Sequence, residues 1–504
     1  MSLPEAIPSK DTGWQRLSSV SIAYFVIKFT ISLLRNAIQS IIPGIAAISF
    51  FADNKVLWFS VALPAAFLLI TVYSFFYYWY FKFKTHEGEI LIHQGVFKKE
   101  LLNLDFDRIQ NVNIIRPFYF APFKVVNCIV ESAGSNAAEI ELPGVKEAFA
   151  IDTRTRVFEA EKPKEERDDE ENEVSKSPDS SMACRKLSNW EMAKSGLTSY
   201  FAFVALAALA PFSDRIFSFL FEYVYSGILA PFESIPILKA FVITVLIFLT
   251  AALLLLTLIA GSVVGALIQN YNYELHDNND RLVRLTGLFE RKSTTLKKSK
   301  VQSIVITQNL AEKILGRVRL QYRQVGTSNE TKSDSHVQVP ILKPDASGTF
   351  ASIVFPDCPQ PGFTKIHHSY VKRVFLYFWV LPLTIIVSIP SILISELFLF
   401  GLVLLIPGLL AVMLRYRRFG YWFTGEYGAI REGFIGNKTT IFPIRKTQTV
   451  RIAQSRGQRI RNLGNLTIQL GSGPVTIPYL PMSNLSEIVD KTLYKTESSS
   501  EPWM

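Results

Sequence analysis

The chain has 504 residues, of which 49% are hydrophobic, and it carries a formal net charge of +10 at pH 7. This length allows several domains, and the apolar residues are gathered into clusters rather than spread evenly along the chain. The three cysteines, Cys128, Cys184 and Cys358, lie far apart and form no paired CxxC spacing. Their pattern argues against a zinc site or a disulfide framework and is typical of thiols in a reducing compartment.

The apolar clusters are long enough to cross a membrane. A spanning helix needs about 17–25 mostly apolar residues, because the hydrocarbon core is about 30 Å thick. The stretches without Asp, Glu, Lys or Arg cover residues 36–52, 56–81, 195–213, 240–269, 374–395 and 397–414. We therefore expect six spans, arranged as three pairs.

The segment before the first span has two open interpretations. Lys28 and Arg35 interrupt an apolar stretch there. The stretch is either a helix that lies in the membrane interface or the start of one long tilted span whose basic side chains reach the headgroups. The N-terminal segment, 1–13, is polar and no short apolar core precedes a small-residue cleavage site, so we expect no cleavable signal peptide.

Charge around the spans predicts their orientation. The turns within the first and third pairs, 53–55 and Glu396, are short, whereas the opposite helix ends are rich in Lys and Arg, as at 82–84 and 415–418. Basic residues favour the cytoplasmic side, so both termini and all soluble domains are expected there. The connector of the second pair, 214–239, is long and aromatic, and whether it is embedded, interfacial or outside stays open.

One motif occurs three times, after each helix pair. In each copy a glycine and a glutamine are separated by the same length of chain, and a basic residue stands two positions before the glutamine. The motif residues are Gly95 and Gln110, Gly287 and Gln302, and Gly433 and Gln448. A basic, apolar and small or polar triplet also leads into each pair, at 16–18, 186–188 and 365–367. The repeat unit is therefore two helices followed by one domain.

Each motif lies in a predicted small β domain. Alternating stretches of β-forming residues precede the glycine and follow the glutamine. The glycine is expected to adopt a positive φ in a turn or bulge. Apolar-Pro pairs at 142–143, 339–340 and 477–478 are expected to end the last strand, since proline cannot donate to a ladder. About 65 residues of strand bury too little surface as an open sheet, so we expect a closed or half-closed barrel.

These motifs resemble those of the bacterial membrane proteins that carry PH-like domains of the second bacterial type, formerly a domain of unknown function. The resemblance covers the helix pairs as well and is closest to the longer members, which have three units on six helices and often accompany a shorter one-unit relative. The first unit departs from the pattern, because it has 122–123 (Pro-Phe) where the others have Leu-Gly at 315–316 and 463–464. The resemblance implies a mixed membrane protein of three helical transmembrane hairpins, each followed by a small cytoplasmic β-barrel-like PH domain.

The chain divides accordingly into nine segments. They are an interfacial segment with transmembrane hairpin 1 (14–81), PH-like domain 1 (82–150), a charged disordered linker (151–185), hairpin 2 (186–270), PH-like domain 2 (271–345), a linker (346–364), hairpin 3 (365–415), PH-like domain 3 (416–490) and a tail (491–504). The acidic part of the first linker, 159–181, is interpreted as a spacer, or as a mask that competes with lipid for basic domains.

No catalytic constellation is evident. The sequence contains no HExxH, GxSxG or P-loop motif. The six histidines are scattered, and the adjacent pair His367-His368 would point its side chains apart in a regular element. We expect no enzyme activity, cofactor or metal site.

The second and third domains are basic. Residues 281–323 contain 11 Lys or Arg against 2 acids, and residues 431–461 contain 8 against 1. Several basic side chains beside an anionic leaflet can hold a domain on the membrane, at roughly 1 kcal/mol each. The alternative is that the charges only reflect the positive-inside bias, and nucleic acid is not expected as a partner. The candidate lipid-docking residues are Arg291, Lys292, Lys297, Lys298, Lys300, Arg445, Lys446, Arg456, Arg459 and Arg461.

The sequence favours a binding role. We expect a non-enzymatic scaffold, or a module that binds protein or lipid at the cytoplasmic face of the cell membrane in envelope maintenance. The expected partners are anionic membrane lipids and another PH-like membrane protein or a second copy. The alternative is a transporter or channel-like assembly with regulatory domains, because prolines occur within the spans. Against this alternative, the middle of each span contains no ionisable residue.

Overall fold

A computed structural model describes residues 13–35, 55–86, 88–106, 109–132, 140–160, 183–198, 218, 236–278, 280–325, 337–393 and 395–498. The chain forms two compact units. Unit 1 contains residues 1–182 and 289–295, and unit 2 contains residues 183–288 and 296–504. The expected span over 36–52, most of the span over 195–213, most of the 214–239 connector and residues 161–181 of the acidic linker lie outside the described residues.

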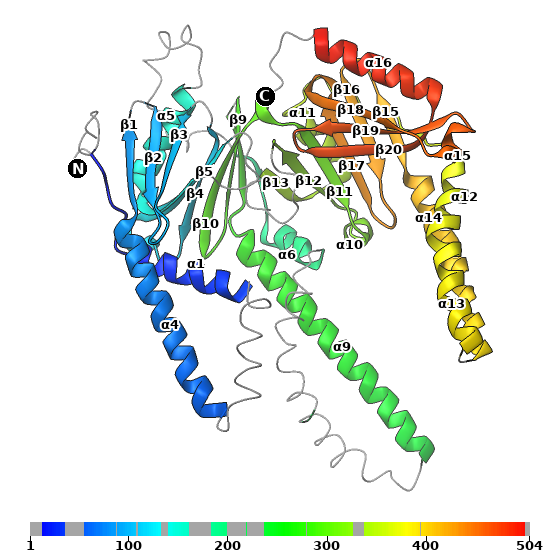
Figure 1. Cartoon of the computed structure of the whole chain (residues 1–504), viewed down its shortest axis with the longest axis horizontal. Coiled ribbons are helices and arrows are strands. Elements are labelled where there is room, and N and C mark those ends of the chain that lie inside the picture. The colour runs from blue at the N-terminus through cyan, green and yellow to red at the C-terminus, as the bar shows by residue number, and fades with distance from the viewer. Residues whose placement is uncertain are drawn as a thin grey trace. The chain divides into compact units, whose positions relative to one another are not determined.

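Unit 1 contains the first domain. Its strands form two three-stranded antiparallel arrays, β1-β2-β3 and β6-β5-β4. The elements are α1 (Ser21–Arg35), α4 (Lys55–Tyr80), β1 (Lys82–His86), β2 (Glu89–Gln94), β3 (Glu100–Asp105), β4 (Ile109–Pro117), η2 (Ala121–Phe123), β5 (Val125–Ser132), β6 (Ile140–Lys146) and α5 (Glu147–Ala160). Ile90 and Ile92 from the first array meet Val112 and Val126 from the second in one core. Figure 1 shows α4 extending away from these strands.

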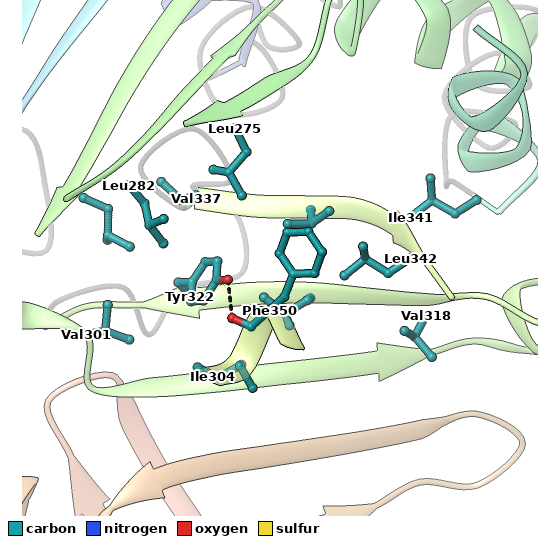
Figure 2. Close-up of a cluster of buried hydrophobic side chains, with 14 of the residues drawn as sticks. Leu275, Leu282, Val301, Ile304, Val318, Tyr322, Val337, Ile341, Leu342 and Phe350 are labelled. Atoms are coloured by element: carbon teal, nitrogen blue, oxygen red, sulfur yellow. Dashed lines mark hydrogen bonds between the residues drawn. The ribbon is translucent and has the colours of Figure 1, made fainter. Parts of the chain in front are cut away.

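The second domain lies in unit 2, apart from the first part of β10. Its elements are β7 (Ala183–Lys186), α6 (Asn189–Leu197), α9 (Pro236–Gln269), β8 (Glu274–Asn278), β9 (Arg281–Thr286), β10 (Glu290–Lys297), η8 (Lys298–Lys300), β11 (Ser303–Gln308), α10 (Leu310–Ile314), β12 (Val318–Arg323), β13 (Val337–Leu342) and α11 (Pro344–Ser352). Figure 2 shows its core, in which Leu275 and Leu282 face Tyr322 and Val337. The Tyr322 hydroxyl donates to the Phe350 carbonyl at 2.7 Å and so fixes the end of α11 to β12.

The third domain completes unit 2. Its elements are β14 (Thr364–Lys365), α12 (Ser369–Phe375), the π-helical turn η10 (Leu376–Val380), α13 (Leu381–Leu393), the 3₁₀ segment η11 (Glu396–Leu404), α14 (Leu405–Arg418), β15 (Gly420–Phe423), β16 (Tyr427–Glu432), β17 (Asn437–Pro443), η12 (Ile444–Lys446), β18 (Thr447–Ala453), α15 (Arg456–Arg459), β19 (Leu463–Leu470), β20 (Gly473–Pro481) and α16 (Met482–Ser498). Phe442 and Leu466 are fully buried in its core.

The strands form open sheets, and no closed barrel is found among the described residues. In unit 2 the sheet of the second domain continues into the third in the order β13-β12-β11-β17-β16-β15-β14. In unit 1, β4 pairs with β10, a strand that belongs to the second repeat. The expectation of a barrel considered each domain by itself. Instead, an edge strand of one repeat pairs with a strand of the next repeat, so its backbone N–H and C=O groups have hydrogen-bond partners without a closed barrel.

The triplet that leads into each helix pair belongs to the domain core. Leu17, Leu187 and Ile366 are each less than 5% exposed, and each joins the core of its own domain. Near Leu17, Gln15 forms an isolated bridge with Phe83. Next to Leu187 and Ile366, β7 pairs with β8 and β14 pairs with β15. Each described domain therefore receives one short strand or bridge before its helices and the rest after them.

The motif glycines have the expected positive φ, with values of 102° at Gly95, 110° at Gly287 and 155° at Gly433. A Cβ on Gly95 would lie 1.9 Å from the Lys98 carbonyl oxygen, so the turn leaves no room for a side chain. Positive φ also recurs at one fixed distance along the chain from each motif glycine, at Lys124, Gly316 and Asn462. This third position aligns the first domain with the others despite its different sequence.

The apolar-Pro pairs do not end their strands, contrary to expectation. β6 continues past Pro143 to Lys146, and β20 continues past Pro478 to Pro481. Both strands lie at the outer edge of their sheets, where a missing N–H needs no ladder partner. The register of β6 and β20 also shifts beside these prolines, which accommodates the residue without a donor.

Three described helices are long and apolar enough to cross a membrane, at Phe248–Gln269, Ser369–Leu393 and Glu396–Arg418. α4 is a 26-residue helix at the position of another expected span. The two helical segments of the third domain pack closely, because a Cβ on Gly408 would lie 2.4 Å from the Trp379 ring. Small residues allow such close approach between helices in a membrane.

α1 is tied to the first domain. The Ser21 hydroxyl donates to the Pro143 carbonyl at 2.7 Å, and Lys28 forms an ion pair with Glu141 of β6. Burial by itself raises the pKa of Glu141, but the Lys28 ammonium and hydrogen bonds from Lys28, Tyr24 and Asn127 outweigh it and hold that pKa below its usual value. The helix ends at Arg35, and the residues after it are not described.

Candidate membrane-facing site

The link between β18 and β19 forms a short helical turn, α15, beside the apolar helices of the third domain. Ser455 precedes the turn, and its backbone N–H donates to the Gln458 side chain at 2.8 Å. Gln458 is 2% exposed and also donates to Asn465 of β19 at 2.7 Å. The buried Gln458 thus fixes the turn to the sheet and directs its other side chains outward.

The outward side chains combine one apolar residue with three arginines. Ile460 is 85% exposed, and Arg456, Arg459 and Arg461 are exposed around it. We call these four residues the α15 tip. An isoleucine exposed to this extent between cationic side chains is typical of a segment that meets the headgroup region of a membrane.

The α15 tip contacts the start of an apolar helix. Arg461 donates to the Ser369 hydroxyl of α12 at 2.9 Å, and Arg373 of α12 lies 3.5 Å from the Ser455 hydroxyl. The helix enters its apolar stretch directly after Arg373, and the companion helix ends with three arginines in the last turn of α14. The tip therefore lies beside the basic ends of the apolar helices of the third domain.

The second domain has an equivalent turn, α10. Its Asn309 cap accepts from the Glu312 N–H at 2.7 Å and donates to the Thr198 carbonyl, just after α6, at 2.9 Å. Ile314 is 78% exposed, and it follows its motif glycine at the same distance along the chain as Ile460 does. The first domain exposes aromatic side chains at this link, with Phe123 of η2 59% exposed. All three links thus present an apolar side chain to their surroundings.

The structure separates the ten candidate docking residues. Arg456, Arg459 and Arg461 meet at the α15 tip. Arg291 and Lys292 lie in β10, where they pair in register with β4, and Lys298 is bound to Asp277 at 2.7 Å. Lys297 at the end of β10 and Lys300 at the end of η8 are half-buried, and Arg445 is half-buried in η12.

Lys446 is buried rather than available at the surface. It is 1% exposed, and its ammonium donates to the Val301 carbonyl at 2.7 Å and to the Ser299 carbonyl. Both acceptors belong to the second domain, so this lysine joins the second domain to the third. Sequence reasoning missed this role because the position looked like one more charge in a basic segment. It also missed Ile460, although an isoleucine that recurs at a fixed distance after the motif glycine was a usable signal.

The motif glutamines differ in environment. Gln302 is fully buried, and Gly471 of the third domain lies close enough that its Cβ would sit 3.4 Å from the Gln302 amide. Gln448 at the equivalent position of the third domain is exposed. The side chain of Gln110 is not among those described. A glutamine of the motif is therefore buried where another repeat covers it.

The described side chains offer no cluster suited to metal binding, since no group of three or more His, Cys, Asp or Glu residues converges among them. The ring centroids of His367 and His368 lie 4.2 Å apart, so the expectation that these side chains point apart was wrong. That expectation assumed a regular element, whereas neither residue lies in a helix or strand. Burial and the neighbouring His368 and Arg461 charges lower the pKa of His367. This histidine pair lies in the segment that links β14 to α12.

Comparison with known proteins identifies the class of protein. The sequence matches the bacterial PH domain family at residues 31–159, 227–354 and 380–496, well over half of its length, and the chain belongs to this family. The resemblance drawn from the repeated motif is thereby confirmed, as is its occurrence in three copies.

A curated relative has nearly the same extent. The chain is 20% identical over 443 residues to the UPF0699 transmembrane protein YdbT of Bacillus subtilis (strain 168), a match that covers 82% of this chain and 84% of that protein. No solved structure matches. The transmembrane relative and the three long apolar helices together define a membrane protein with PH-like domains.

Proposed function

We propose that this chain is a non-enzymatic, multi-pass membrane protein that works as a binding scaffold at the cytoplasmic face, in envelope maintenance. Its helices would form three transmembrane hairpins, and its domains and both termini would face the cytoplasm. Anionic lipids would hold the domains against the leaflet. The observation that carries this proposal is the α15 tip, where an 85% exposed isoleucine lies among arginines beside the start of an apolar helix.

The charges at the tip suit an anionic leaflet. A Lys or Arg near such a surface contributes roughly 1 kcal/mol, so Arg456 and Arg459 together would contribute about 2 kcal/mol. This energy corresponds to roughly a 30-fold change in the ratio of docked to undocked tips. Arg461 is excluded from this sum because it already binds Ser369.

A fluorescent probe at the tip tests the docking. Ile460→Cys, labelled with an environment-sensitive dye in a Cys184→Ser, Cys358→Ser background, is placed in the full chain in nanodiscs of neutral lipid with or without anionic lipid. Cys128 can remain, because burial raises its pKa to about 12 and makes it unreactive. We expect a blue shift that grows with anionic lipid and that Arg456→Gln with Arg459→Gln removes.

A dye at Tyr494→Cys on α16, 74% exposed, is the matched control and should not respond to lipid charge. A tip dye that ignores anionic lipid would contradict the docking. Orientation is tested with the same Tyr494→Cys variant and a membrane-impermeant maleimide. Labelling is expected in inside-out vesicles and not in right-side-out vesicles, and the reverse result would overturn the cytoplasmic placement.

A further inference from the structure

Two strands at sheet edges, one in the first repeat and one in the third, are equivalent to strands that are paired in the other repeats. β3 lies at the edge of the sheet β1-β2-β3 in unit 1, and β18 lies at the edge of the sheet β18-β19-β20 in unit 2. The strands β10 and β17 are equivalent to β3, and the strands β4 and β11 are equivalent to β18. These equivalent strands pair with each other. β4 pairs with β10 in unit 1, and β11 pairs with β17 in unit 2.

Both of these junctions use the same register. Ile114 of the first repeat pairs with Ser293 of the second, and Ile306 of the second repeat pairs with Thr439 of the third. Counted from the motif glycine of its own repeat, Ile114 occupies the same position as Ile306, and Ser293 the same position as Thr439. Two independent junctions with one register indicate that the edges of this repeat are complementary to each other.

Exposure differs as expected for an edge that has no strand beside it among the described residues. At the junction Val305 of β11 is fully buried and Ile306 is half-buried, and their counterparts in β18 are Arg451 and Ile452, both exposed. In β18, Ile452 is 42% exposed, and in β3, Leu101 is 63% exposed. Gln448, the counterpart of the buried Gln302, is exposed as well. Apolar side chains on an open edge favour pairing with another strand.

We propose that β18 of one copy of this chain pairs with β3 of a second copy, antiparallel and in the register of the internal junctions. Ile452 is the third-repeat counterpart of Ile306, and Leu101 is the first-repeat counterpart of Thr439. The shared register therefore places these two exposed apolar residues opposite each other. Arg451 then lies diagonally across from Glu100, which adds an attractive charge pair. The chain already pairs these two types of edge twice within itself, so the same two types are complementary when they come from two copies.

The contact is head-to-tail. Each copy offers one edge of each kind, so the interface is heterologous and continues into a ring or a row. Copies anchored in one membrane share a surface, which raises their effective concentration for such pairing. Main-chain hydrogen bonds would hold the two strands together, and the apolar pair would fix their register.

Disulfide crosslinking tests the pairing. Two full-length chains with different tags are coexpressed in the Cys184→Ser, Cys358→Ser background, one with Leu101→Cys and the other with Ile452→Cys, and the membranes are oxidised. We expect a mixed disulfide between the two tags. The register control combines Leu101→Cys with Arg451→Cys, whose side chain points to the opposite face, and should give about tenfold less product.

A cysteine pair within one chain is the positive control for disulfide formation. Ile306→Cys and Thr439→Cys occupy the same ladder position within one chain and should form an intrachain disulfide, which also reports that the domains are folded. The proposal is overturned if this internal pair crosslinks while the Leu101 and Ile452 pair does not, since the edges then do not meet. It is also overturned if a double Leu101→Cys, Ile452→Cys chain forms only an intrachain disulfide, because the three domains then close on themselves.

Discussion

Replacing Lys446 with alanine is expected to loosen the junction between the second and third domains. This residue is 1% exposed, and its ammonium donates to the carbonyls of Ser299 and Val301. The substitution leaves the buried Val301 carbonyl without this donor, at a cost of about 1–3 kcal/mol. The partly buried Ser299 carbonyl loses a donor that water replaces in part, and removal of the desolvation penalty of the charge offsets some of the cost, so the net loss should be about 1–3 kcal/mol.

Hydrogen exchange on the full chain in detergent or nanodiscs measures this loss. A loss of about 2.7 kcal/mol corresponds to roughly 100-fold faster exchange of the amides that join β11 to β17. Lys446→Met, which keeps most of the volume but still removes the donor, should also accelerate exchange. Arg459→Ala is the matched control, because Arg459 is exposed at the α15 tip and its loss should leave this ladder unchanged.

A Lys446→Ala variant that kept the β11 and β17 amides within about threefold of their original protection would refute this role of Lys446. It would be refuted more strongly if the same variant reduced the lipid response of the tip dye to the level of the Arg456→Gln, Arg459→Gln variant. That result would show that the lysine acts at the membrane surface rather than between the domains.

Three further substitutions follow from local geometry. Gly95→Ala should destabilise the first domain by about 1–3 kcal/mol, measured by hydrogen exchange of β2 and β3, because φ is 102° and a Cβ would overlap a carbonyl oxygen. Gly408→Leu should separate the two helical segments of the third domain and change the fluorescence of Trp379, whereas Leu410→Ala, at an exposed position, should not. Glu141→Gln should release α1 at pH 7, seen as faster exchange of that helix. The pKa of Glu141 is depressed in the folded chain, so its stabilisation is present above about pH 4.3 and is lost as the pH falls through the folded value. The difference between Glu141→Gln and the unaltered chain should therefore vanish at lower pH, and a pH-independent difference would contradict the ion pair with Lys28.

Short-range features were predictable from the sequence. The glycine of each motif has the positive φ that its turn requires. At Gly95 and Gly433 only a residue without a side chain fits beside the carbonyl oxygen that follows it. The long apolar stretches are helices where the structure describes them, as at Ser369–Leu393, because length and hydropathy suffice to specify such a helix. The threefold repeat was visible for the same reason, since a fixed spacing is written in the chain itself.

The pairing between repeats was decided by the tertiary structure. From the sequence, each domain was expected to form its own closed or half-closed barrel, but β11 pairs with β17 of the next repeat. A strand's alternating pattern specifies which face is buried and leaves open which neighbour binds its edge, because backbone hydrogen bonds do not distinguish partners. The burial of Lys446 depends on this pairing as well. A lysine in a basic segment is read as a surface charge until another domain brings two carbonyls to it, and only the assembled fold places the Val301 carbonyl 2.7 Å from its ammonium.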